Sequence, residues 1–213
     1  GAITLGGRSL TPDEAAPEAV WANADVFFGG GARAFMTSAL KSPALKWVQS
    51  GAAGFDNPVF GQFVQKGARL TTSHGQAVGM ADYVLWGVLD AFQDGAARRA
   101  AQAAGQWDRR PFREIDGSRW LILGFGAIGR GVAQRAKAFG AHVTAVRRSV
   151  APDARADRIA PPSAFLDLLP NADVVVLAAP ATPETRHIAN ADAFGRMKPG
   201  AVFVNVGRGA LVD

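Results

Sequence analysis

The residues with the clearest chemical meaning in this sequence begin at Gly124. They read Gly124-Phe125-Gly126-Ala127-Ile128-Gly129, which is the spacing G-x-G-x-x-G. In such a turn the first glycine permits a tight bend, the second lets a pyrophosphate approach the backbone, and the third lets a helix pack closely on a strand. The free N–H groups of the first helical turn, which holds Ala127 and Ile128, attract phosphate oxygens. The spacing predicts a dinucleotide-binding turn.

The flanks of this turn supply the context that the motif needs, because G-x-G-x-x-G alone is a weak signal. An apolar run, Leu121–Leu123, predicts a strand before it, and His142–Val146 predicts a second strand after it. Between the two strands, apolar residues recur at helical spacing at Ile128, Val132, Ala136 and Phe139. Gly140 suits the C-terminal cap of this helix. The order strand, glycine turn, helix, strand favours a dinucleotide site over an ordinary glycine-rich loop.

Arg147, Arg148 and Ser149 follow the second predicted strand, where NAD-preferring sites place an acidic residue for the ribose 2′-hydroxyl. A 2′-phosphate instead suits the planar guanidinium fork, and a carboxylate would repel it. We therefore predict that NADP(H) binds in preference to NAD(H). The alternative, that the two arginines form a solvated surface edge, stays open.

A loop of small residues, Ser50–Asp56, follows another predicted strand. Ligands of open α/β sheets bind beyond the carboxyl ends of the strands. Bare N–H groups in this loop could hold a carboxylate there, because large side chains would block its approach. An ordinary glycine turn is the alternative.

Composition narrows the class of protein. The 213 residues carry a net charge of +5, 48% are hydrophobic, and none is cysteine. The absence of cysteine excludes disulfides and thiolate metal sites and fits a reducing, cytoplasmic location; we predict no metal. The basic residues are scattered without a nucleic-acid-binding motif, so we expect anionic small molecules and no nucleic acid as partners. The longest apolar runs, such as Val174–Ala179, are too short to cross a membrane, and no signal peptide is visible.

Strands and helices alternate along the chain, which predicts an α/β fold with parallel sheets in two domains, residues 1–75 and 76–213. In the first domain we expect strands at Ala24–Phe28, Leu45–Gln49 and Arg69–Thr72, with helices near Pro12–Trp21 and Ala32–Lys41. In the second we expect helices at Gly79–Phe92, Ala96–Ala104, Ser163–Leu169 (capped by Ser163) and Asn190–Met197, with buried strands at Ala172–Ala179 and Ala201–Val206.

Several segments resemble the D-isomer-specific 2-hydroxyacid dehydrogenases, the family of phosphoglycerate dehydrogenase and glyoxylate/hydroxypyruvate reductase. The resemblance covers about Ala24 to Asp213. It rests on LKWVQSGAAGFDN, ADYVL, LGFGAIG and above all ADVVVLAAPATPETRHIAN with MKPGAVFVNVGRGALVD. It implies a flavodoxin-like substrate domain followed by a Rossmann dinucleotide-binding domain.

The resemblance also implies roles for single residues. Arg208 matches the catalytic arginine that holds the 2-oxo acid by its carboxylate and carbonyl oxygens. Ala53 and Gly54 match the loop whose amides bind the substrate carboxylate, and Gln76 matches a hinge position that touches substrate. Ala179, Pro180 and Thr185 match the loop that lines the ribose and phosphates of the cofactor. Val206 and Gly207 match the positions that line its nicotinamide.

One departure from the family pattern concerns the catalytic histidine and its glutamate partner, which follow the VNVGRG strand in the family and would lie after Asp213. We interpret His74, His142 and His187 as structural or solvated residues. The last strand, Ala201–Val206, would also leave an exposed apolar edge. We therefore expect a fragment of a longer chain whose dinucleotide domain lacks its last strands here.

The function predicted is hydride transfer between NADP(H) and a small 2-oxo or 2-hydroxy acid such as glyoxylate or hydroxypyruvate. We expect this chain to bind NADPH and to turn over poorly or not at all. A non-catalytic NADP(H)-binding protein of the same fold is the alternative, and a formate-type dehydrogenase is disfavoured because its additional active-site residues are not found. The family commonly forms homodimers, and we expect Gly79–Phe92 at the contact.

Overall fold

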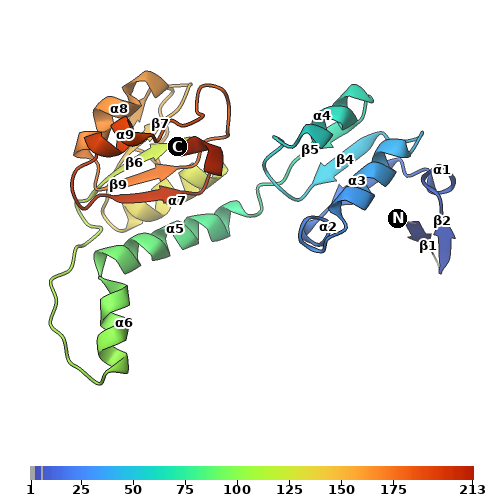
Figure 1. Cartoon of the computed structure of the whole chain (residues 1–213). Coiled ribbons are helices and arrows are strands. Elements are labelled where there is room, and N and C mark those ends of the chain that lie inside the picture. Colours follow the sequence, from blue (N-terminus) through green and yellow to red (C-terminus); the bar gives the residue numbers. More distant parts are fainter. Residues whose placement is uncertain (1–2, 6) are drawn as a thin grey trace. The chain divides into compact units, whose positions relative to one another are not determined.

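The computed structural model describes residues 3–5 and 7–213. It divides into two compact units, Gly1–Gln76 and Ala77–Asp213 (Figure 1). Each unit is α/β with a parallel sheet, which confirms the predicted fold class.

The second unit is built on a five-stranded parallel sheet with the order β10-β9-β6-β7-β8. The strands are β6 (Arg119–Leu123), β7 (His142–Val146), β8 (Arg158–Ala160), β9 (Val174–Leu177) and β10 (Val202–Asn205). All but β8 were predicted from apolar runs. β8 has only three residues and begins with an exposed arginine, so it has no such run.

Helices cover both faces of this sheet (Figure 1). On one face α5 (Ala77–Phe92) and α7 (Ala127–Ala138) pack on a core that includes Trp120, Ile122 and Val176. On the other face α8 (Phe165–Leu168) and α9 (Ala191–Arg196) pack on Leu121, Val175 and their neighbours. Strand β9, which lies between β10 and β6, is fully buried, as expected for a parallel strand with helices on both faces.

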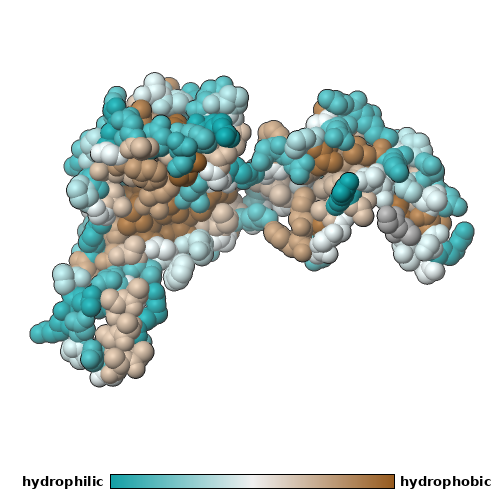
Figure 2. Space-filling view, viewed as in Figure 1, coloured by the Kyte–Doolittle hydropathy of each residue, from teal (hydrophilic) through white to brown (hydrophobic). Residues whose placement is uncertain are grey.

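The edge strand β10 is half-buried, so the prediction that it is a buried strand was wrong. Within the described residues it pairs with β9 alone, and its other edge has no strand beside it. Figure 2 shows hydrophobic surface on the side of the unit where β10 and α5 lie. This agrees with the expected exposed apolar edge.

The helix ends confirm the predicted cap at Gly140, contradict the one at Ser163 and add one at Asn190. Gly140 follows α7 with a φ of 82°, the left-handed conformation of a C-terminal glycine cap. The side chain of Asn190 caps α9 by accepting a bond of 3.1 Å from the Ala193 N–H. Ser163 does not cap α8, because Pro161 and Pro162 start a 3₁₀ turn, η1 (Pro162–Ala164), that places Ser163 inside it.

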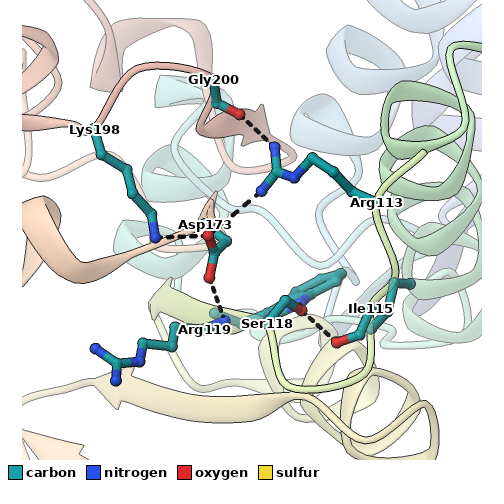
Figure 3. A network of polar contacts seen from close by, with 8 residues as sticks. Arg113, Ile115, Ser118, Arg119, Asp173, Lys198 and Gly200 are labelled. Carbon is teal, nitrogen blue, oxygen red and sulfur yellow. Dashed lines mark hydrogen bonds and ion pairs between the residues drawn. The ribbon is translucent and has the colours of Figure 1, made fainter. Parts of the chain in front are cut away.

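A polar network at the amino end of β6 ties the segment after α6 (Gly95–Ala103) to the sheet (Figure 3). The Asp173 carboxylate accepts bonds from Lys198 Nζ at 2.6 Å and the Arg119 N–H at 2.8 Å. Arg113 donates to the Gly200 carbonyl at 2.6 Å, contacts Asp173 at 3.4 Å, and lies 4.0 Å from the centroid of the Phe92 ring. Burial favours a raised pKa for Asp173, but the bonds from Lys198 and Arg119 outweigh it and lower this pKa.

Asp173→Asn should destabilise the protein by about 2 kcal/mol at pH 7, because it removes a charged acceptor from Lys198 and Arg113. Since folding lowers the pKa of Asp173, its stabilisation is complete above the unfolded value of about 3.9 and is lost as the pH falls through the folded value. Urea unfolding at pH 7 and pH 3 should show a smaller difference between wild type and variant at pH 3. Asp192→Asn, which removes an exposed i,i+4 pair with Arg196, should cost less than about 0.5 kcal/mol.

The first unit has a three-stranded parallel sheet with the order β3-β4-β5. Its elements are the antiparallel hairpin of β1 (Ile3–Leu5) and β2 (Arg8–Leu10), then α1 (Pro12–Ala15), β3 (Ala19–Ala22), α2 (Ala24–Phe28), α3 (Ala32–Lys41), β4 (Trp47–Ser50), α4 (Pro58–Gln65) and β5 (Arg69–Thr71). Val48 of β4 and Phe63 of α4 lie at the centre of its core.

Two predictions for the first unit were wrong. The segment Ala24–Phe28 is helix α2 and not a strand, because the Asn23 side chain accepts a bond from the Val26 N–H at 3.1 Å and starts a helix there. The expected helix over Pro12–Trp21 ends at Ala15, and Ala19–Ala22 forms β3, which pairs in parallel with β4. Helix α4 was not predicted.

Candidate dinucleotide and oxo-acid site

The predicted cofactor residues meet at one edge of the second sheet. Because its strands are parallel, their carboxyl ends share an edge. The segments that leave this edge are Gly124–Gly129 after β6, Arg147–Ser149 after β7, Ala179–Thr185 after β9 and Val206–Arg208 after β10. Four separate stretches of sequence thus form one candidate site.

The glycine turn has the geometry that each glycine predicts. Gly124 has a φ of +92°, and a Cβ there would lie 2.5 Å from the Ala179 N. A Cβ on Gly129 would lie 2.1 Å from the Gly124 carbonyl oxygen, so helix and turn are in direct backbone contact. A Cβ on Gly126 would meet no atom within 4 Å, so the space beside this backbone is open.

Helix α7 starts at this open space. Its N-cap is Gly126, and no side chain caps its first turn, which contains Ala127 and Ile128. Uncapped N–H groups and the positive end of a helix dipole form an anion site. The open cradle and the uncapped helix fit the pyrophosphate of a dinucleotide.

The two arginines after β7 differ in their surroundings. Arg147 is half-buried, donates a hydrogen bond to the Ala151 carbonyl, and has its guanidinium carbon 5.8 Å from the centroid of the Phe125 ring. Its Nε is buried and has no hydrogen-bond partner within the described part of the chain. A buried donor without an acceptor costs about 1–3 kcal/mol, which an incoming oxyanion would offset. Arg148 and Ser149 are exposed.

The loop after β9 is closed by Thr185, whose Oγ1 donates to the Pro180 carbonyl at 2.7 Å and accepts from the Thr182 N–H at 2.8 Å. Hydrogen bonds from Thr182 and from its own N–H lower the pKa of the exposed Glu184, and the positive charge of Arg148 contributes. Glu184 of this loop is therefore within electrostatic range of Arg148.

The turn after β10 is organised by Asn205, a residue that the sequence reading did not single out. Its side chain accepts from the Gly207 N–H at 3.0 Å and donates to the Arg208 carbonyl at 2.9 Å. A Cβ on Gly207 would lie 2.7 Å from the Ala179 carbonyl oxygen, so this turn packs on the end of β9. Arg208 is half-buried, and its Nη1 donates to the Gly207 carbonyl at 2.9 Å. An asparagine at a strand end is a usual turn signal that could have been used.

The other predicted substrate residues lie in the first unit. Ala53 and Gly54 are half-buried in the loop after β4, where the Ala52 N–H donates to Ser50 Oγ at 3.1 Å. The Ala52 carbonyl accepts from the Ser73 N–H at 3.3 Å, so this loop lies beside the end of β5. Gln76 is exposed and is the last residue of the unit.

Comparison with known proteins identifies the family. Residues 85–213 match the model of the "D-isomer specific 2-hydroxyacid dehydrogenase, NAD binding domain". The chain belongs to this family.

Similar proteins and solved structures support the same family assignment for this 2-hydroxyacid dehydrogenase chain. The glyoxylate reductase of Thermococcus kodakarensis is 32% identical over 81% of the chain and 55% of the relative. A glyoxylate reductase structure from Paecilomyes thermophila has a TM-score of 0.77 at 28% identity and covers 92% of this chain and 60% of its own. A family structure from Xanthobacter autotrophicus Py2, in complex with NADPH and MES, has a TM-score of 0.74 at 26% identity. The match covers 97% of this chain and 63% of the Xanthobacter chain.

The chain thus spans about half the length of the first curated relative. Its matched part is the family's NAD-binding domain, which supports a nicotinamide dinucleotide as the cofactor. Among the described residues no cluster of three or more histidine, aspartate or glutamate side chains could hold a metal ion. No helix in the described ranges is long and apolar enough to cross a membrane.

Proposed function

We propose that this chain binds NADP(H) in preference to NAD(H) and belongs to a reductase of small 2-oxo acids. The observation that supports the preference is the arginine pair after β7, where the buried Nε of Arg147 has no acceptor among the described residues. A phosphate dianion offers acceptors to such donors, whereas a ribose hydroxyl carries no charge to attract them. The relative from Xanthobacter autotrophicus that binds NADPH supports the same choice.

Arg208 would hold the substrate. Its guanidinium fork can donate to the carboxylate and to the oxo group together, which orients the acid and polarises the carbonyl. The Asn205 turn fixes the backbone on both sides of Arg208. NADPH, when bound, supplies the hydride that reduces the oxo carbon. We assign the first unit to substrate binding. The amides of Ala53 and Gly54 in this unit would bind the carboxylate, and Gln76 would contact the substrate.

Arg208→Ala should weaken the binding of oxamate, an unreactive mimic of a 2-oxo acid, by about 100-fold, because two charge-assisted bonds are lost. Calorimetry on the NADPH-loaded protein measures this. Arg208→Lys, which keeps the charge and loses the fork, should recover only part of the affinity. Arg186→Ala removes an exposed arginine near the site and should change little. Tight NADPH binding by a wild type that does not bind oxamate would favour the non-catalytic alternative.

We also propose a homodimer that uses α5. On this helix Tyr83 and Trp86 are 62% and 57% exposed, and their ring centroids lie 5.4 Å apart. Exposed aromatic pairs favour interfaces. Light scattering should give twice the chain mass, and Trp86→Arg should give a monomer; a monomeric wild type at micromolar concentration would contradict this. The cytoplasmic location stays a prediction.

A further inference from the structure

A cavity separate from the dinucleotide site, called the second cavity below, lies at the opposite edge of the same sheet, over the amino ends of β6, β7 and β8. It measures about 340 Å³. It is lined by three basic residues, two other polar residues and four apolar ones: Arg119, His142 and Arg158; Thr144 and Asn171; Trp120, Leu121, Leu168 and Ala172. None of these lining residues belongs to the segments of the dinucleotide site.

The strand register explains why the basic side chains meet. Arg119 pairs with His142 across β6 and β7, and Thr144 pairs with Arg158 across β7 and β8. Neighbouring strands are about 4.8 Å apart, and every second residue of a strand faces the same side. Arg119, His142 and Arg158 therefore project from the same face of the sheet.

The guanidiniums of Arg119 and Arg158 differ in their ion pairing from several others in this unit. Within the described ranges neither Arg119 nor Arg158 has a carboxylate partner, whereas Arg113, Arg130 and Arg135 each have one. In Figure 3 the Arg119 side chain points away from Asp173, which its backbone N–H contacts. Asp173 is engaged by Lys198.

Asp157, a carboxylate close to His142, is also engaged. Asp157 is paired with Lys137 and accepts a hydrogen bond at 2.8 Å from the N–H of Val143, the residue that follows His142. The cavity lining itself contains no acidic residue among those described. Among the residues that the structure describes, the positive charges of Arg119 and Arg158 therefore have no carboxylate counter-ion.

We propose that this cavity binds a small organic dianion, a phosphate monoester or a dicarboxylate. Its charged oxygens contact Arg119 and Arg158, with His142, Thr144 and Asn171 as further polar partners. Its short carbon skeleton lies against Leu121 and Leu168. Convergent polar groups over an apolar floor are the usual composition of a small-molecule site. This site is independent of NADP(H) binding.

Proton NMR of the three histidines tests the proposal, because His142 lines this cavity while His187 follows the loop at the dinucleotide edge. Inorganic phosphate, glycerol 2-phosphate and succinate are titrated separately at constant ionic strength against potassium chloride. We expect the His142 signal to shift and saturate at millimolar concentration or below with at least one dianion, and not with chloride. Comparison of the titrations with glycerol 2-phosphate and with succinate shows which dianion the cavity prefers.

The variant Arg119→Gln/Arg158→Gln should weaken this shift at least tenfold, and the melting temperature shows whether it folds. Arg33→Gln, which removes an exposed arginine of the first unit, should leave the shift unchanged. Two results would overturn the proposal: a His142 signal that does not saturate with any dianion, or one that saturates equally in the double variant. A shift confined to His187 would report phosphate at the dinucleotide site and would also count against it.

Discussion

Gly129→Ala should destabilise the dinucleotide-binding unit by about 3 kcal/mol or more, although alanine is the better helix former by about 1 kcal/mol. The added Cβ would lie 2.1 Å from the Gly124 carbonyl oxygen, a backbone atom that cannot rotate away. Helix α7 must then move off the turn, and the open cradle at Gly126 is lost with it. Thermal unfolding followed by circular dichroism should show a fall in melting temperature of about 6–12 °C.

Gly126→Ala is the matched control within the same turn. A Cβ on Gly126 would meet no atom within 4 Å, so the only expected cost to folding is the weaker N-cap, about 1 kcal/mol or less. Its Cβ would instead stand where the pyrophosphate approaches the backbone. This variant should therefore fold normally and bind both nicotinamide dinucleotides at least tenfold more weakly. Equal melting temperatures for the two alanine variants would contradict this account of the turn.

Arg147→Asp should weaken NADPH binding by about 100-fold and leave NADH binding unchanged or stronger. The substitution removes a guanidinium from the 2′-phosphate and adds a like charge, together worth about 2–4 kcal/mol, while a carboxylate can accept a bond from the 2′-hydroxyl of NADH. Fluorescence titration with each coenzyme measures both affinities.

Two further variants separate an effect on phosphate binding from an effect on folding. Arg147 is half-buried beside Phe125, so the melting temperature of its variant must be compared with that of Arg148→Asp, whose side chain is exposed. Arg148→Asp should also discriminate against NADPH. Arg109→Asp makes the same charge change on an exposed arginine of the link after α6 and should leave the ratio of the two affinities unaltered. An equal loss of both coenzymes in the Arg147 variant would mean that it acts on the fold and not on the phosphate.

The second unit was predictable from sequence because its signals are local and strong. The run before Gly124, the helical spacing up to Phe139 and the β-branched run to Val146 gave β6, α7 and β7. The parallel order of the strands then places Arg147, Ala179 and Gly207 at one edge, even though they are far apart in sequence.

The first unit was less predictable because its decisive signals are single side chains. Val26, Phe27 and Phe28 have high strand propensity, yet the Asn23 cap starts a helix through them. Asn205, Arg119 and Arg158 were not singled out, and His142 was interpreted as structural or solvated, for a different reason. Their roles depend on side-chain contacts or on strand register that no short motif encodes.

The central claim is that the arginine pair after β7 seats the 2′-phosphate of NADP(H). Isothermal titration of the wild-type chain with NADPH and NADH at the same ionic strength tests it most directly. We expect NADPH to bind at least tenfold more tightly, a difference of about 1.4 kcal/mol or more. Equal affinities, or tighter binding of NADH, would contradict the account.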